Sequence, residues 1–474
     1  MNDKSEFIKA IRFIFLTALF YGFMFWSQIR YNLFVPYSLF IFTVVALLIL
    51  VRPRQGFAAF VFAVILSETH FLYGYEFFQS IYTFKIAGFS LIDFLLFLLI
   101  FRMLFHVFLT GQIRWQTTVW DRGFLVVSGM VILYAIIGPA FGATLRNWLV
   151  DVKAMLFLIA PFFMVRFFMR DGKDIVHFFQ MIVYVLLGKI IVYFVGYLIK
   201  FGLTRDLVVR VTLTSDVVFY PVILLICLVI YLQSAQKGIK WTALVLAIIT
   251  FLDVFWSFGR EAWFWTFISV ILFGIVAGGK IKIRIFKIMA VTAILTAVMI
   301  TVIRPQTWEY AVTSIKTFSL KTTGKGEEET GAVRAIEWVN VHKLLAESNT
   351  VLIGRGMGAT WNDRFFALPK KRDIYSFPIT ETEHVFTHMV FSKFYLKFGL
   401  LGSLIIWASL IIPWVKTIKW SGKLPDQYRR FLLAILMGCI GVFAKLEIIR
   451  VALIGGLILG AISSVIISFG ENEN

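Results

Sequence analysis

Cysteine and charge are both scarce in this chain of 474 residues. Only two cysteines occur, Cys227 and Cys439, and both lie within apolar runs. Two such residues exclude a disulfide framework and a cysteine-based zinc site, so we expect them to serve in packing. Charged residues make up 15% of the chain, against about 25% in a typical soluble domain. This shortage of charge excludes a soluble enzyme.

The sequence is instead rich in long runs of hydrophobic residues. Hydrophobic residues make up 60% of the chain, and its mean hydropathy is +0.86. A helix needs about 20 apolar residues to cross a bilayer, and apolar runs of that length recur from Ile8 to Phe469. The sequence therefore predicts an all-α fold, a polytopic bundle of transmembrane helices.

Apolar runs set against clusters of Lys and Arg predict about fourteen spans. The predicted spans are 8–26, 33–51, 57–72, 88–105, 124–141, 147–168, 175–199, 212–233, 241–257, 262–279, 285–303, 388–415, 430–446 and 450–469. The first run has no small-residue cleavage site before Arg30, so we expect a retained helix. With a cytoplasmic N-terminus every inner loop is basic, as the positive-inside rule requires. Both termini are then cytoplasmic. The surplus of basic residues, 46 − 27 = +19, fits such loops, and no soluble domain is present to bind nucleic acid.

One outer loop, residues 304–387, is long and polar. It holds 11 Lys and Arg and 10 Asp and Glu, a composition suited to an aqueous mini-domain. The chain thus divides into helices at 1–303, this extracytoplasmic loop, and the last helices at 388–474. Inside the loop an amphipathic helix is predicted from Ala332 to Ser348, because Arg334, Trp338, Val341 and Leu345 follow helical spacing.

Basic residues on the predicted outer side run against the usual charge bias. An arginine offers a planar fork of donors that suits phosphate oxygens. The alternative is that each arginine reaches toward lipid headgroups or pairs with a nearby carboxylate. Arg260 stands in a tight junction between two spans, where its guanidinium must face the mouth of the bundle or Glu261. The candidate arginines are Arg146, Arg205, Arg210, Arg260, Arg304 and Arg334.

Two histidines lie near the start of the span at 388–415. A neutral imidazole at His388 is able to take a proton from a substrate hydroxyl, although a solvated or capping role is the alternative. His384 precedes it by four residues, but the intervening Val-Phe-Thr lacks the glutamate of zinc proteases. We therefore expect no metal site here.

Several short motifs resemble, in order, those of the O-antigen polymerase and O-antigen ligase family, membrane glycosyltransferases of the GT-C type. His388 is followed eleven residues on by Gly399-Leu400-Leu401-Gly402, which is similar to the histidine and Gly-x-x-Gly of the family. Gly354-Arg355-Gly356-Met357-Gly358 resembles the family's glycine stretch in the outer loop. Arg334 with Trp338 resembles its arginine and tryptophan helix, and Ser257 to Arg260 its serine and arginine junction. The sequence departs from the family pattern at Gly259, Met389 and Phe391.

The resemblance implies a metal-independent, inverting enzyme without a cofactor in the bacterial cytoplasmic (inner) membrane, with its active site extracytoplasmic. It implies that Arg210 and Arg260 bind the diphosphate of an undecaprenyl-diphosphate-linked oligosaccharide and that His388 acts on the acceptor hydroxyl. Arg334, Arg146, Arg304 and His384 are further candidates for binding substrate. Membrane lipids and a chain-length regulator are the other expected partners.

The leading hypothesis is a polysaccharide polymerase of the O-antigen or capsule type. An O-antigen ligase acting on lipid A-core shares the same residues. A transporter or flippase for lipid-linked oligosaccharides would instead need charges deep in the bundle, and a structural assembly protein would tolerate loss of Arg260 and His388.

Overall fold

Long helices make up most of the described chain. The computed structural model describes residues 4–31, 33–67, 70–71, 76–77, 81–82, 84–86, 88–111, 117–169, 172–201, 217–257, 260–303, 330–366, 384, 389–446 and 448–470. The helices are α1 (Lys4–Tyr31), α2 (Phe34–Val51), α3 (Pro53–Leu66), α4 (Leu91–Thr110), α5 (Val119–Ala140), α6 (Leu145–Phe168), α7 (Gly172–Phe201), α9 (Tyr220–Gln233), α10 (Lys237–Trp256), α11 (Arg260–Ala277), α12 (Gly279–Ile303), α14 (Thr330–Glu347), α15 (Val390–Trp420), α16 (Asp426–Gly438), α17 (Ile440–Phe443) and α18 (Ile449–Gly470), with a 3-10 turn, η1 (Ser421–Lys423).

Each predicted span overlaps at least one of these helices. Among the described residues, eight helical segments are long and apolar enough to cross a membrane. They are Phe7–Met24, Leu91–Thr110, Val119–Ala140, Leu145–Phe168, Asp174–Ile199, Lys237–Trp256, Val390–Lys423 and Ile449–Phe469. The protein is therefore an all-α, multi-pass membrane protein.

Two small hairpins interrupt the helices between α3 and α4, where the sequence predicted no strands. β1 (His70–Phe71) pairs antiparallel with β2 (Glu76–Phe77), and β3 (Lys85–Ile86) with β4 (Phe89–Ser90). The predicted third span ends earlier than expected, at Leu66. Helix α4 begins at Leu91, three residues later than predicted, because a capping box sets its start. The Asp93 carboxylate accepts a hydrogen bond from the Ser90 backbone N–H at 2.7 Å.

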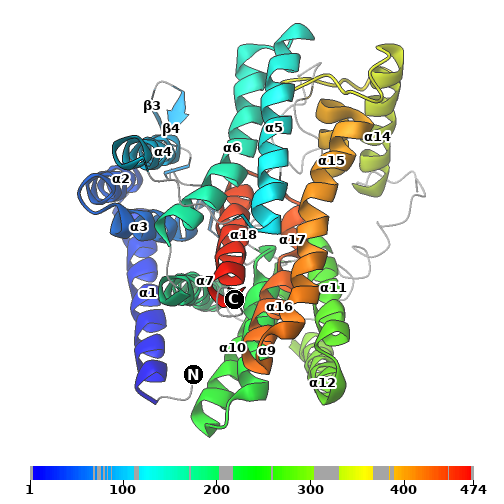
Figure 1. Cartoon of the computed structure of the whole chain (residues 1–474). Helices are drawn as coiled ribbons and strands as arrows, with labels where there is room; N and C mark the ends of the chain where they lie inside the picture. Colours follow the sequence, from blue (N-terminus) through cyan, green and yellow to red (C-terminus); the bar gives the residue numbers. More distant parts are fainter. Residues whose placement is uncertain are drawn as a thin grey trace.

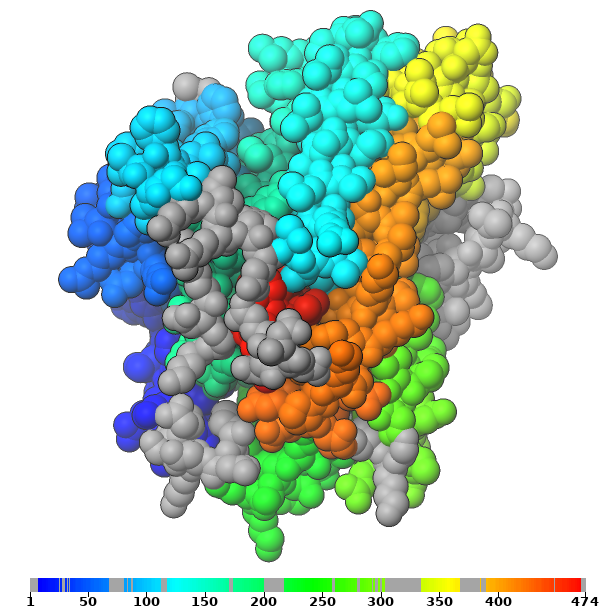
Figure 2. All heavy atoms as spheres, viewed as in Figure 1, coloured from blue at the N-terminus to red at the C-terminus, as the bar shows by residue number. Residues whose placement is uncertain are grey.

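The core is built around α18, which packs along α6. Glycine allows this close approach, since a Cβ on Gly456 would lie 2.2 Å from the Leu158 carbonyl oxygen and one on Gly460 would lie 2.6 Å from that of Phe162. Small residues four apart are a usual device for packing membrane helices. Of the apolar window in α18, 78% is buried inside the protein, against 28% for α1. Figure 2 accordingly shows only a small red patch of α18 between its neighbours.

Contacts between helices show which helix ends lie together. Figure 1 shows α5, α6 and α15 side by side, with α14 beside one end of α15. At this end, which we call the α14 end, the rings of Tyr134 and Phe398 lie 5.0 Å apart. At the opposite end the Trp120 indole donates to the Thr417 hydroxyl at 2.8 Å. Hence α5 and α15 run antiparallel, and the start of α6 shares the α14 end.

Candidate functional site

Helix α15 is broken at Gly399. The backbone there has φ 66° and ψ −170°, a combination that essentially only glycine adopts. Such a break leaves carbonyl oxygens before it and N–H groups after it without their helical partners. Away from water these groups need partners from another part of the chain.

The segment 350–359, which we call the glycine loop, supplies those partners. Four backbone hydrogen bonds join it to the break: Arg355 N–H to Leu396 O at 3.0 Å, Gly356 N–H to Lys397 O at 2.8 Å, Leu400 N–H to Val351 O at 2.9 Å and Leu401 N–H to Leu352 O at 3.1 Å. Two motifs noted in the sequence therefore meet directly. They are the glycine stretch at 354–358 and the Gly-x-x-Gly motif that begins at Gly399.

Glycine is required on the loop because its backbone presses against other backbone atoms. Gly354, Gly356 and Gly358 all have φ between 69° and 84°. A Cβ on Gly354 would lie 2.3 Å from the Gly399 nitrogen, and one on Gly356 would lie 2.3 Å from that of Gly138. The loop is therefore held between α15 and the last turns of α5.

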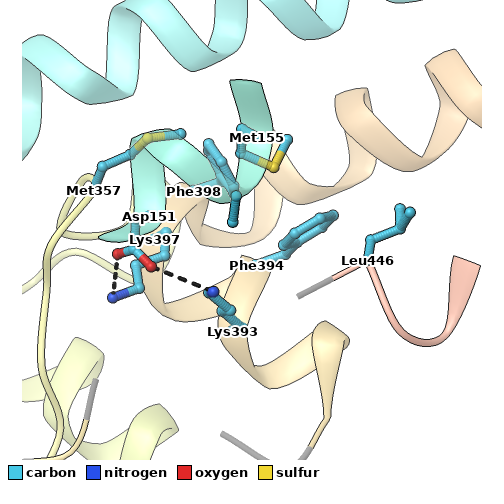
Figure 3. A pocket seen from close by; sticks show the side chains of 9 residues that line it. Asp151, Met155, Met357, Lys393, Phe394, Lys397, Phe398 and Leu446 are labelled. Atoms are coloured by element: carbon cyan, nitrogen blue, oxygen red, sulfur yellow. Dashed lines mark ion pairs between the residues drawn. The ribbon is translucent and has the colours of Figure 1, made fainter. Parts of the chain in front are cut away.

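A buried charged cluster lies where the loop, α6 and α15 meet (Figure 3). The Asp151 carboxylate on α6 lies 2.7 Å from the Lys397 ammonium and 3.3 Å from the Lys393 ammonium, both on α15. No more than 6% of any of these side chains is exposed. Two ammonium groups on one carboxylate leave an excess of one positive charge if all three are ionised.

Apolar side chains surround this cluster. They form a small pocket with room for about one water molecule. Its apolar wall consists of Ala154, Met155, Met357, Phe394, Phe398 and Leu446. A pocket this narrow and this apolar strengthens the ion pairs inside it by excluding water.

A second charged cluster is more open. Glu261, at the start of α11, contacts the Arg334 guanidinium on α14, and its other oxygen lies 2.6 Å from the Lys445 ammonium. These side chains are 14–28% exposed, so solutes can reach them. Arg334 uses Nη2 on Glu261, and its Nε donates no hydrogen bond within the described residues. Two cations again share one carboxylate.

Helix α14 packs on the first half of α15. The rings of Trp338 and Tyr395 stack with centroids 5.0 Å apart, and His342 Nδ1 lies 2.8 Å from the Tyr395 hydroxyl. Val341 and Leu345 are fully buried. The predicted amphipathic helix is confirmed, and it lies against the protein.

The structure brings some of the predicted site residues together. Arg334 contacts Glu261, the residue after Arg260, so the chain at Arg260 lies beside α14; the Arg260 side chain is outside the described part. His384 pairs through its backbone with Trp361, and the two rings lie 4.8 Å apart. Arg146 is exposed in the first turn of α6, and no contact joins it to either charged cluster among the described residues. The remaining predicted residues lie outside the described residues: Arg205, Arg210, Arg304 and His388.

Four residues of these clusters were not predicted as site residues: Asp151, Lys393, Lys397 and Lys445. Their signal was present, because charged residues inside apolar runs are costly and mark functional sites. Lys393 and Lys397 are also four apart, which places them on one face of a helix. Within the described residues no group of three His, Cys, Asp or Glu side chains gathers to hold a metal ion.

Comparisons with known proteins add no relative. No protein-family model matches the chain, and neither does any curated protein or solved structure.

Proposed function

We propose that this protein is a polysaccharide polymerase. It would transfer a glycan from undecaprenyl diphosphate to a hydroxyl of another lipid-linked repeat unit at the outer face of the bacterial cytoplasmic membrane. The observation that carries the proposal is the contact between Arg334 and Glu261. It joins two segments that lie far apart in the sequence, one with Arg260, predicted to bind the diphosphate, and one with Arg334, predicted to bind substrate. It also adds Lys445.

The proposal includes a topology of about fourteen spans with residues 304–387 outside. Contacts between helix ends support the alternation of sides in this topology. Arg54 and Asp174, both predicted to be cytoplasmic, lie 3.8 Å apart. Asp93 and Lys153, both predicted near the outer surface, lie 2.6 Å apart. The Glu261 cluster joins three segments that the same topology places outside.

The chemistry needs positive charge at the leaving group. The acceptor oxygen attacks the anomeric carbon, the bond from that carbon to the diphosphate oxygen breaks, and the diphosphate departs on its lipid. Arg334, Lys445 and Arg260 would stabilise the charge that develops on the diphosphate. His388, which immediately precedes the described start of the α15 region at Met389, would take the hydroxyl proton. Attack from the face opposite the diphosphate inverts the anomeric centre.

The test is a product analysis with purified protein and a defined undecaprenyl-diphosphate-linked repeat unit. A polymerase makes a ladder of longer glycans on a gel. Alanine at His388 or Arg260 is expected to lower the rate by about 100-fold or more, since a general base and a charge-stabilising donor each contribute that much.

The outcome also separates the alternatives. Glycan that appears only on added lipid A-core makes the protein a ligase and rejects the polymerase. Movement of the intact lipid-linked glycan across a vesicle membrane, with no new bond, makes it a transporter. A ladder that is equally strong in both alanine variants contradicts the assigned roles.

A further inference from the structure

We infer that Asp151 and Lys397 form a latch that holds the glycine loop and the first half of α15 in the position that glycan transfer needs. In this role both are positioning residues and neither touches substrate. The functional part of this inference rests on the proposed function, whereas the latch itself is a statement about the fold.

The contacts of the latch tie three separate elements together. One oxygen of Asp151, Oδ2, accepts a hydrogen bond from the Gly358 N–H at 2.7 Å and lies 2.7 Å from the Lys397 ammonium. The same ammonium donates to the carbonyl oxygen of Ala359. Helix α6, the glycine loop and α15 therefore meet at one carboxylate and one ammonium.

Burial makes these contacts strong. Asp151 and Lys397 are 3% and 1% exposed, so neither charge has water to replace a lost partner. Removing Asp151 leaves the buried Lys397 ammonium without a counter-charge, which is far more costly than loss of a surface pair. Because residues 354–358 belong to no helix or strand, their position depends on such tertiary contacts.

The position of α15 matters because of what precedes it. Val390 begins the helix two residues after His388, and Lys393 and Lys397 are on its first half. The latch thus fixes this half of α15 relative to α6, and the role proposed for His388 depends on where this helix begins. A misplacement of a catalytic group by about 1 Å can lower a rate by about 100-fold.

The chain offers a matched control on the same helix. Lys153, two residues after Asp151, lies 2.6 Å from the Asp93 carboxylate at the same end of α6. That pair contacts neither the glycine loop nor α15 among the described residues. Lys153→Met therefore removes an ion pair of similar length from α6 and leaves the latch intact.

The first readout is hydrogen exchange of the backbone amides of residues 355–358 in the purified, full-length protein. In wild type we expect slow exchange, although these residues lie outside regular secondary structure. In Asp151→Asn and in Lys397→Met we expect exchange at least about tenfold faster, with no such change in Lys153→Met. Fast exchange in wild type, or equal exchange in all variants, overturns the latch, and the wild-type result does so even if a variant does not fold.

The second readout is the turnover of lipid-linked glycan. We expect the two latch variants to lower kcat by about 100-fold while KM changes by less than about threefold, because substrate contacts remain. A normal kcat with a released loop refutes the positioning role and retains the latch. If wild type itself makes no glycosidic bond, the proposed function fails, and the exchange experiment still decides whether the latch exists.

Discussion

Replacing Gly399 with alanine is expected to destabilise the protein by about 3 kcal/mol or more. The backbone at Gly399 has φ 66° and ψ −170°, which costs any other residue about 1–3 kcal/mol. The new Cβ would also lie 2.3 Å from the Gly354 nitrogen, a backbone atom of the loop that four hydrogen bonds join to α15. Thermal unfolding of the purified protein in one detergent measures the loss.

The matched control is the same substitution at Gly129, in the middle of α5. A Cβ there meets no other atom within 4 Å, and alanine is the better helix former by about 1 kcal/mol. Gly129→Ala is therefore expected to keep or raise the unfolding temperature. If the two variants unfold at the same temperature, α15 is continuous and the glycine loop does not fill a break in it.

Replacing Arg334 with glutamine is expected to lower kcat/KM for the lipid-linked donor by about 100-fold or more. The guanidinium contacts Glu261 through one amino group and has other N–H groups for a phosphate oxygen. Glutamine keeps part of the length and loses the charge and the fork that bind phosphate in two places. Initial rates at several donor concentrations, with undecaprenyl diphosphate as the measured product, give the change.

Arg364 provides the control for this variant. It also pairs with a glutamate, Glu347, but both side chains are about half exposed, at 52% and 51%. Surface pairs contribute little, so Arg364→Gln is expected to keep kcat/KM within about twofold of wild type. An equal loss of kcat/KM in both variants would mean that Arg334 stabilises the segment 304–387 and does not bind the diphosphate.

Much of the fold could be predicted from the sequence, because each membrane-spanning helix is marked by a long run of apolar residues. Each predicted span overlaps a helix, and the spacing of Val341 and Leu345 located α14. The hairpins between α3 and α4 were missed, since strands of two residues carry no readable period. The break in α15 was missed for a related reason: a single glycine in a helical pattern is usually tolerated.

The candidate site was predictable only in part. Arg334 and the glycines of the glycine loop were predicted from local pattern and resemblance, and both lie at the α14 end. Asp151 was not, because an isolated carboxylate in an apolar run does not indicate its partner. Lys397 follows it by more than 200 residues in the chain, and only the folded structure brings the two side chains together.

If the protein transfers a glycan from a lipid diphosphate, undecaprenyl diphosphate must be released. Purified wild-type protein is incubated with a defined undecaprenyl-diphosphate-linked repeat unit, and the free lipid diphosphate is measured by mass spectrometry against the amount of new glycosidic bond. We expect one undecaprenyl diphosphate to be released for each bond formed, whichever acceptor is used. Donor that remains intact in the presence of both repeat-unit and lipid A-core acceptors would contradict it.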